Sequence, residues 1–184
     1  MPGQAMPASD RNDACVVMGV AGCGKSLVGS ALAQTLGWTY VEGDLLHPPA
    51  NVQRMASGLP LTDEHRWGWL DAIGQEIAHS QQHGAGAVAA CSALKRAYRD
   101  RLRRYSRRLL FVYLEIDRET AAERVTARKG HFMPASLVDS QFAALEPPGR
   151  GEMAVTLDAR RPVAELVAEA AAALGSRGQM TLGH

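Results

Sequence analysis

The stretch of sequence that most constrains the fold spans residues 15–36 and reads CVVMGVAGCGKSLVGSALAQTL. A short apolar run at 15–18 leads into a glycine-rich segment at 19–26, and residues with the apolar spacing of a helix follow. A strand, a glycine loop and a helix in this order, with the spacing G-x-x-x-x-G-K-S, are typical of a phosphate-binding loop. A chance glycine-rich turn is the alternative, and the flanking strand and helix argue against it. The stretch therefore predicts a nucleotide-phosphate site.

Each residue type in this loop has a physical role. Glycines adopt backbone conformations closed to other residues, so successive N–H groups can turn towards an anion. The N-terminus of the following helix adds partial positive charge. The Lys25 ammonium can reach the β- and γ-phosphates of a nucleotide, and the Ser26 hydroxyl can bind Mg²⁺. The loop residues expected to bind ATP are Gly19, Val20, Ala21, Gly22, Cys23, Gly24, Lys25 and Ser26.

Strand-like and helix-like segments alternate along the rest of the chain. Strands are expected at 14–18, 38–42, 86–91, 109–115 and 153–157, and helices at 25–36, 48–57, 63–83, 95–105, 118–128, 135–145 and 162–174. This alternation predicts an α/β fold, a parallel sheet with helices on both faces that binds ligands beyond the carboxyl ends of its strands. We expect one domain over residues 14–174, with flexible termini at 1–13 and 175–184.

Composition narrows the class of protein. The chain has 184 residues, 46% of them apolar, which is enough to bury a core. Its net charge of +1 creates no field that attracts nucleic acid or an anionic membrane. No apolar run approaches the roughly 18 residues of a membrane span, and residues 1–13 lack the pattern of a signal peptide. We therefore expect a cytoplasmic protein that binds small molecules.

The three cysteines show no zinc-type spacing. Cys15, Cys23 and Cys91 lie in the first strand, the glycine loop and the third strand, so buried thiols are the expectation. A redox role for Cys23 is the alternative, because a helix N-terminus lowers the pKa of a thiol.

Polar residues follow the second expected strand. Asp44 would stand beside the glycine loop, where a carboxylate can hold Mg²⁺ through water or accept a proton from an attacking hydroxyl. A helix cap or turn is its alternative role. His47, before two prolines, either fixes a turn or contacts the substrate. Arg66 lies in the first turn of a helix, where a cation opposes the helix dipole. An anionic substrate or a salt bridge to Asp63 would compensate this charge.

A basic run follows the third expected strand. Lys95, Arg99 and Arg103 share one helix face. We expect Lys95 and Arg99 to point into the cleft and the later members to be solvated. A nucleic-acid patch is the alternative, but aromatic residues for stacking are not interleaved with the run.

A second basic segment precedes Gly130 and Pro134, which bracket a short flap. Arg124 and Arg128 are four residues apart on the preceding helix. Cations on a flap beside a phosphate site predict a mobile lid, at about 128–134, that closes over the γ-phosphate and excludes water. An exposed basic helix end, which the helix dipole favours, is the alternative.

Several stretches together resemble one known family. The segments GVAGCGKS, GDLLHPPANVQRMASGLPLTD, CSALKRAYRDRLR and RKGHFMPASLVDSQFAALEPP are similar to those of gluconokinases, small P-loop kinases related in fold to shikimate and nucleoside monophosphate kinases. The resemblance covers about residues 16–174. It implies a P-loop NTPase three-layer sandwich with strand order 2-3-1-4-5, and often a homodimer. It also implies ATP- and Mg²⁺-dependent phosphorylation of the 6-hydroxyl of D-gluconate, which gives 6-phospho-D-gluconate and ADP.

The resemblance combines with the residue chemistry into a set of expected roles. We expect catalysis from Lys25, Asp44 and Arg128, metal binding by Ser26, and adenine near Arg124 and Arg160. Substrate binding is expected from Asp44, His47, Arg66, Lys95, Arg99 and His131. The chain departs from the family at Ala21 and Cys23, where serine is usual, and at Gly68, where proline is common. A kinase of shikimate or of a nucleoside monophosphate, or a nucleotide-gated binding protein without transfer, is the alternative function.

Overall fold

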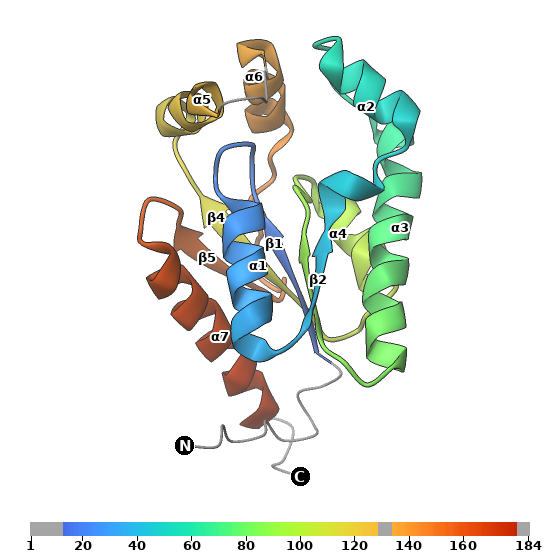
Figure 1. Cartoon of the computed structure of the whole chain (residues 1–184), viewed down its shortest axis with the longest axis vertical. Helices are drawn as coiled ribbons and strands as arrows, with labels where there is room; N and C mark the ends of the chain where they lie inside the picture. The colour runs from blue at the N-terminus through green and yellow to red at the C-terminus, as the bar shows by residue number, and fades with distance from the viewer. Residues whose placement is uncertain (1–12, 129–133, 180–184) are drawn as a thin grey trace.

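A computed structural model of the chain describes residues 13–128 and 134–179 (Figure 1). Within these ranges, a five-stranded parallel sheet has the order β2-β3-β1-β4-β5. The strands are β1 (Ala14–Met18), β2 (Thr39–Glu42), β3 (Ala87–Ala90), β4 (Leu109–Glu115) and β5 (Ala154–Asp158). The order confirms the expected doubly covered α/β sandwich.

The central strand shows how one short segment supplies two cores. All of β1 is buried, and its side chains alternate between the two faces of the sheet. Cys15 and Val17 pack with helices α1 (Lys25–Leu36) and α7 (Val163–Gln179). Val16 packs with helix α3 (Asp63–Gln82) and with residues of α4 (Arg96–Arg103). A strand that is apolar at every position is what a sheet covered on both faces requires.

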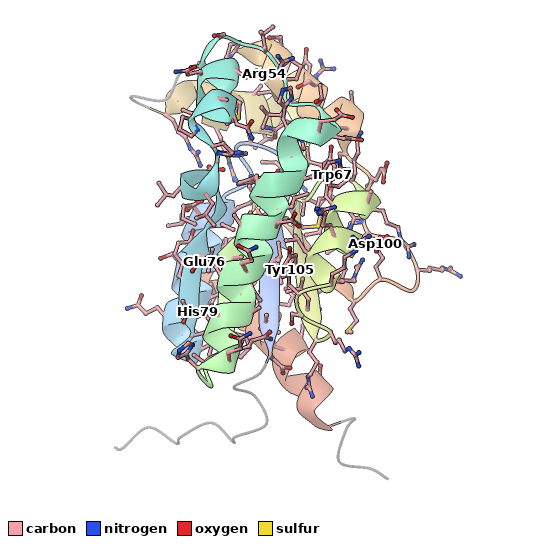
Figure 2. The ribbon with its side chains drawn as sticks, turned by 90° about the vertical axis from the view of Figure 1, so that its right-hand side faces the viewer. Arg54, Trp67, Glu76, His79, Asp100 and Tyr105 are labelled. Atoms are coloured by element: carbon pink, nitrogen blue, oxygen red, sulfur yellow. The ribbon has the colours of Figure 1, made fainter. Side chains whose placement is uncertain are left out.

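Helices α3 and α4 cover one face of the sheet and contact each other. Figure 2 shows α3 running along this face, with Trp67 on it and α4 beside it. The ring of Trp67 meets the ring of Tyr98 edge to face, with 5.6 Å between the centroids. The guanidinium of Arg101 lies 5.3 Å from the Trp67 ring centroid. These contacts fix α4 against the first turns of α3.

Four shorter elements lie beyond the carboxyl ends of the strands (Figure 1). They are the 3₁₀-helix η2 (Gly43–Leu46) and the helices α2 (Pro49–Ala56), α5 (Arg118–Ala127) and α6 (Ala135–Ala144). Helices α5 and α6 stand on one side of the loop between β1 and α1, and α2 stands on the other. Ligands of parallel sheets bind at this end, and these elements enclose it.

The observed elements agree closely with the expected ones, with three differences. The sequence pattern missed η2, which carries Asp44. Helix α7 continues through Gly175 to Gln179, beyond the predicted end at Leu174, and Leu174 is buried in the core. Asp13, expected in a flexible leader, is buried and pairs with Arg108.

Two further expectations concern the cysteines and membrane spans. Cys15, Cys23 and Cys91 are all buried, as predicted. None of the helices within the described residues is both long and apolar enough to cross a membrane. Of the predicted lid at 128–134, residues 129–133 lie outside the described ranges.

Candidate functional site

The glycine loop has the backbone geometry that a phosphate site needs. Gly19 has φ +144°, and a Cβ there would lie 2.8 Å from the carbonyl oxygen of Leu114. Gly22 has φ +85°, and a Cβ there would lie 2.6 Å from the carbonyl oxygen of Ala121 in α5. Larger side chains would both strain the backbone and clash with its neighbours. Helix α1 begins directly after Gly24, so its free N–H groups face the loop.

Lys25 is placed to serve this loop. Its ammonium donates a hydrogen bond to the carbonyl oxygen of Val20 at 3.1 Å and lies 4.0 Å from the Cys23 sulfur. The side chain therefore turns back across the loop. An ammonium in this position is available to an anion that enters the ring of amides.

One contact to the loop was not anticipated from the sequence. The backbone N–H of Ala21 donates to the side-chain oxygen Oε1 of Gln141, on α6, at 2.7 Å. The two residues are 120 positions apart. Gln141 lies within one of the segments that resemble gluconokinases, but no local pattern assigns its amide to the loop.

Ser26 and Asp44 carry side-chain oxygens and share Tyr40 as a neighbour. The hydroxyl of Tyr40 donates to the carboxylate of Glu42 at 2.6 Å, and its oxygen lies 3.3 Å from the carbonyl oxygen of Ser26. Burial raises the pKa of Tyr40, the hydrogen bond to Glu42 adds to this, and the charge of Asp44 contributes as well. Tyr40 thus has both Ser26 and Asp44 as neighbours.

This donor set suits Mg²⁺ bound together with a nucleotide. Among the described residues, no group of three or more His, Cys, Asp or Glu side chains forms a metal cage. Mg²⁺ in nucleotide sites is held mainly by phosphates and waters, with one or two protein oxygens. The hydroxyl of Ser26 and the exposed carboxylate of Asp44 fit that requirement.

The segment that carries Asp44 is fixed by α3. The indole N–H of Trp69 donates to the carbonyl oxygen of Gly43 at 2.7 Å. A Cβ on Gly43 would lie 2.3 Å from the carbonyl oxygen of Ala90, so only glycine fits between η2 and β3. The ring of His47 stacks on Trp69 with 4.0 Å between centroids. Burial, and then the nearby charge of Arg66, lower the pKa of His47 to about 4, so its ring is neutral near pH 7.

A cavity of about 330 Å³ lies next to this segment. Its walls come from the start of α3, the start of α4 and helix α6. Arg66 and Lys95 are its cationic lining residues. The Nε atom of Arg66 is buried and has no hydrogen-bond partner within the described part of the chain. A buried guanidinium N–H without a partner is costly, so Arg66 is ready for an anionic ligand.

Lys95 is already occupied by a protein partner. Its ammonium donates to the carboxylate of Asp63 at 2.9 Å, and the hydroxyl of Tyr98 donates to the same oxygen. These two hydrogen bonds, first the one from Tyr98, lower the pKa of Asp63. The salt bridge expected as an alternative for Arg66 is therefore made by Lys95. Arg66 instead lies over the Tyr98 ring, 5.5 Å from its centroid.

The chain is similar to known proteins over most of its length. A family described as AAA domain matches residues 15–148. A gluconokinase of Gluconobacter oxydans is 47% identical over 146 residues, 79% of this chain and 82% of that protein. The thermoresistant gluconokinase of Escherichia coli is 41% identical over 154 residues, 83% and 88% of the two chains. The chain belongs to the gluconokinase family.

A solved structure supports the same assignment. The crystal structure of a gluconokinase from Sinorhizobium meliloti superposes with a TM-score of 0.84 at 44% identity, over 94% of this chain and 98% of that one. The five-stranded order of the sheet and the enclosing helices thus belong to a gluconokinase fold. The resemblance that the sequence motifs indicated is confirmed.

One expectation from the sequence, that Arg99 points into the cleft, is corrected by the structure. Arg99 does not face the cleft, because its side chain is only 1% exposed. Its guanidinium forms a two-pronged ion pair with Glu152, at 2.7 and 2.9 Å, and donates to the carbonyl oxygens of Ala93 and Leu94 at 3.0 and 3.2 Å. Arg103, on the same helix face, also pairs with Glu152 at 2.8 Å. Arg99 is thus a structural residue that holds the loop before Lys95.

The residues expected near adenine are brought together at the end of β5. The guanidinium of Arg124, on α5, donates to the carbonyl oxygen of Ala159 at 3.1 Å. Arg160, in the same loop, forms an exposed ion pair with Asp158 at 2.9 Å. Arg128 lies just beyond α5 with an exposed side chain. His131, the remaining predicted site residue, lies outside the described residues.

Two of the three departures from the expected gluconokinase pattern, Cys23 and Gly68, fit their local surroundings. Cys23 is buried beneath the loop, and its sulfur would lie 2.7 Å from a Cβ on Gly19. Gly68 is exposed on α3, and a Cβ there would meet no atom within 4 Å. Helix α3 nevertheless begins at Asp63 and runs unbroken past Gly68. The proline that is common at this position is therefore not needed to start the helix.

Proposed function

We propose that this chain transfers the γ-phosphoryl group of ATP to the 6-hydroxyl of D-gluconate, giving 6-phospho-D-gluconate and ADP. The observation that carries the proposal is the grouping of charges at the end of β3. The Cys91 thiol there is buried, and burial raises the pKa of Cys91 to about 12, while the charges of Lys25, Asp44 and Arg66 also act on it. The phosphate loop, the Asp44 carboxylate and the Arg66 guanidinium on the cavity therefore lie at the same end of the sheet.

The phosphate side depends on groups of the glycine loop. Phosphoryl transfer has a loose transition state, so positioning and charge neutralisation contribute more than proton transfer. The amides of the loop and the Lys25 ammonium would hold the triphosphate. Mg²⁺, when bound near Ser26 and Asp44, would neutralise part of the charge on the phosphates.

The acceptor side depends on side chains around the cavity. The guanidinium of Arg66 would bind the carboxylate of gluconate, because its planar donors match a carboxylate and its Nε has no protein partner. The neutral ring of His47 and the ion-paired Lys95 would hydrogen-bond hydroxyls of the chain of gluconate. Asp44 would orient the 6-hydroxyl and accept its proton.

The transfer step can be written with its bonds and protons in balance. The oxygen of the 6-hydroxyl forms a bond to the γ-phosphorus as the bond from that phosphorus to the β–γ bridging oxygen breaks. The hydroxyl proton passes to the Asp44 carboxylate late in the reaction and then to solvent. Arg128, and His131 of the lid segment, would stabilise the charge on the transferred group.

A coupled assay of ADP formation tests this function. It compares D-gluconate with other sugar acids, shikimate and a nucleoside monophosphate, each with ATP and Mg²⁺. We expect the highest kcat/KM with gluconate. A higher value with shikimate or a nucleotide would overturn the substrate assignment. Tight ATP binding without ADP formation for every acceptor would indicate a binding protein instead.

The state of assembly is a separate part of the proposal. Gluconokinase membership suggests a homodimer, and light scattering on the purified chain measures its molar mass directly. A mass near the 19.7 kDa of one chain would contradict a dimer.

A further inference from the structure

A buried asparagine joins the two segments that carry His47 and Arg66. Asn51, on α2, is only 3% exposed. Its side-chain nitrogen Nδ2 donates to the backbone carbonyl oxygen of His65 at 2.7 Å. His65 lies in the first turn of α3 and directly precedes Arg66. The same Nδ2 atom lies 3.4 Å from Nδ1 of His47. One buried amide thus contacts both the segment after β2 and the start of α3.

The contact with the His65 carbonyl settles which way the Asn51 amide faces. A carbonyl oxygen only accepts hydrogen bonds, so the amide atom at 2.7 Å is the NH₂ group and not the oxygen. An NH₂ group has two hydrogens. One is donated to the carbonyl, and the other is left for Nδ1 of His47. Asn51 therefore presents a donor to the His47 ring.

A donor beside Nδ1 determines where the His47 ring carries its proton. A proton on Nδ1 would face the amide hydrogen of Asn51 across 3.4 Å, and two donors repel each other. Nδ1 is therefore the unprotonated nitrogen, and the single proton of the neutral ring lies on Nε2, because the hydrogen bond of one ring nitrogen sets the state of the other. The ring stacks on Trp69 with 14° between the planes, which holds its orientation.

The second ring nitrogen is left for a ligand. Nε2 of His47 has no hydrogen-bond partner among the described residues. Of the side-chain nitrogens and oxygens in the described ranges, only Nε of Arg66 is fully buried without a partner, so Nε2 of His47 is accessible. Burial and the charge of Arg66 both lower the pKa of His47, so the two side chains are close to each other. A ring N–H next to a guanidinium favours an oxygen acceptor, such as a carboxylate or hydroxyl oxygen of an acid.

We propose that Asn51 is a positioning residue that fixes the neutral His47 ring with its proton on Nε2, so that His47 donates a hydrogen bond to an oxygen of the acid substrate. The inference rests on the proposed function, because it takes an acid bound beside Arg66 as the acceptor. Asn51 is itself buried and acts through His47. With the opposite tautomer, Nε2 would carry a lone pair and would repel a carboxylate oxygen.

Nuclear magnetic resonance of the ring nitrogens tests the tautomer without any substrate. The full chain is labelled with ¹⁵N-histidine, and a long-range ¹H–¹⁵N spectrum at about pH 7 distinguishes the protonated from the unprotonated nitrogen of each ring. The chain has six histidines, and the signals that vanish in His47→Gln identify His47. We expect its proton on Nε2. A proton on Nδ1, or an equal mixture of the two tautomers, would overturn the proposal.

Two substitutions of Asn51 change the contact in different ways. Asn51→Asp places a group that only accepts hydrogen bonds beside the ring, so Nδ1 of His47 should carry a proton in this variant. Asn51→Ala removes the donor, so the ring should populate both tautomers and the KM for gluconate should rise by about two- to tenfold. Gln53→Ala, which removes an exposed amide from the same helix, is the control and should change neither. A wild-type His47 spectrum in both Asn51 variants would overturn the proposal, and the spectrum of wild type decides the tautomer even where a variant does not fold.

A double-mutant cycle tests whether Asn51 acts through His47. In the His47→Gln background, Asn51→Ala should raise the KM for gluconate by less than about twofold more, because the ring that Asn51 orients is already absent. An equal rise in both backgrounds, or a matching loss of ATP affinity, would indicate a general loss of structure and overturn the proposal. Failure of the proposed function gives a different result, because wild type would then form no ADP with gluconate while its His47 spectrum still showed the proton on Nε2.

Discussion

The phosphate loop and the cavity lined by Arg66 and Lys95 differ in the groups that they present to a ligand. The loop is continuous in sequence, residues 19–26, and presents mainly backbone N–H groups. The cavity combines side chains from α3, α4 and α6, which are far apart in the chain. Backbone recognition depends on local glycine geometry, whereas side-chain recognition depends on how helices pack. The difference predicts that substitutions in the two regions will fail in different ways.

The largest expected effect is on the loop. Lys25→Ala should lower kcat by about 10³-fold or more, because it removes the charge that neutralises the transferred phosphoryl group. The melting temperature should change little, since the hydrogen bonds of the Lys25 ammonium go to atoms of the loop itself. The coupled ADP assay and a thermal melt measure both. Activity above about a tenth of wild type would contradict the role of Lys25 as a phosphate clamp.

On the cavity side, the largest expected effect is a loss of stability. Arg99→Ala leaves the buried carboxylate of Glu152 without its two-pronged partner, so the free energy of unfolding should fall by about 3–5 kcal/mol. Arg96→Ala, an exposed arginine on the same helix, is the matched control and should cost less than about 0.5 kcal/mol. Urea unfolding measures both. Unchanged stability together with a raised KM for gluconate would show that Arg99 binds the substrate after all.

We expect Asp44 to act between the phosphate loop and the cavity. Its substitution therefore distinguishes an effect on the transfer step from an effect on ATP binding. Asp44→Asn should lower kcat about 10²-fold, because an amide cannot accept the proton of the acceptor hydroxyl. The Kd of ATP should stay within about threefold of wild type. Asp100→Asn, at an exposed position on α4, is the control for a changed surface charge. An equal loss in kcat and in ATP affinity would mean that Asp44 has a structural role.

Arg66 tests the cavity alone. Arg66→Lys keeps the charge but removes the planar set of donors, so the KM for gluconate should rise about tenfold while the KM for ATP stays constant. Arg96→Lys repeats the substitution at an exposed position and should change neither value. Steady-state kinetics with each substrate varied in turn give both constants. An equal rise in the KM for ATP would show that Arg66 affects both sites and not the cavity alone.

The smallest expected effect concerns pH and His47. Its folded-state pKa is about 4 and its ordinary value is 6.5, so between these values the unfolded chain binds a proton that the folded chain does not. The free energy of unfolding should therefore fall as the pH drops from about 6.5 to about 4. His47→Gln should flatten this slope by less than one proton, measured by urea unfolding at several pH values, and the exposed His83→Gln should not. An unchanged slope in His47→Gln would contradict a buried neutral ring.

Arg66 and Arg99 show where sequence reasoning reached its limit. Both are arginines near the start of a helix, and the sequence offered both, together with Lys95, as candidates for substrate binding. The structure separates them by their partners: Arg66 keeps a buried Nε without one, and Arg99 is saturated by Glu152 and two carbonyl oxygens. Glu152 is 53 residues away from Arg99, so no helical or strand period could have paired them.

The sequence by itself determined the order of strands and helices, the phosphate loop and the family. These features arise from local patterns, namely glycine spacing, apolar periodicity and capping, which can be recognised within a few residues. Only the tertiary structure decided which charged groups meet. The contact of Gln141 with Ala21 joins positions 120 residues apart, and the ion pair of the buried Asp13 with Arg108 joins positions 95 apart. Such contacts depend on strand order and helix packing, because a parallel sheet brings distant loops together at one edge.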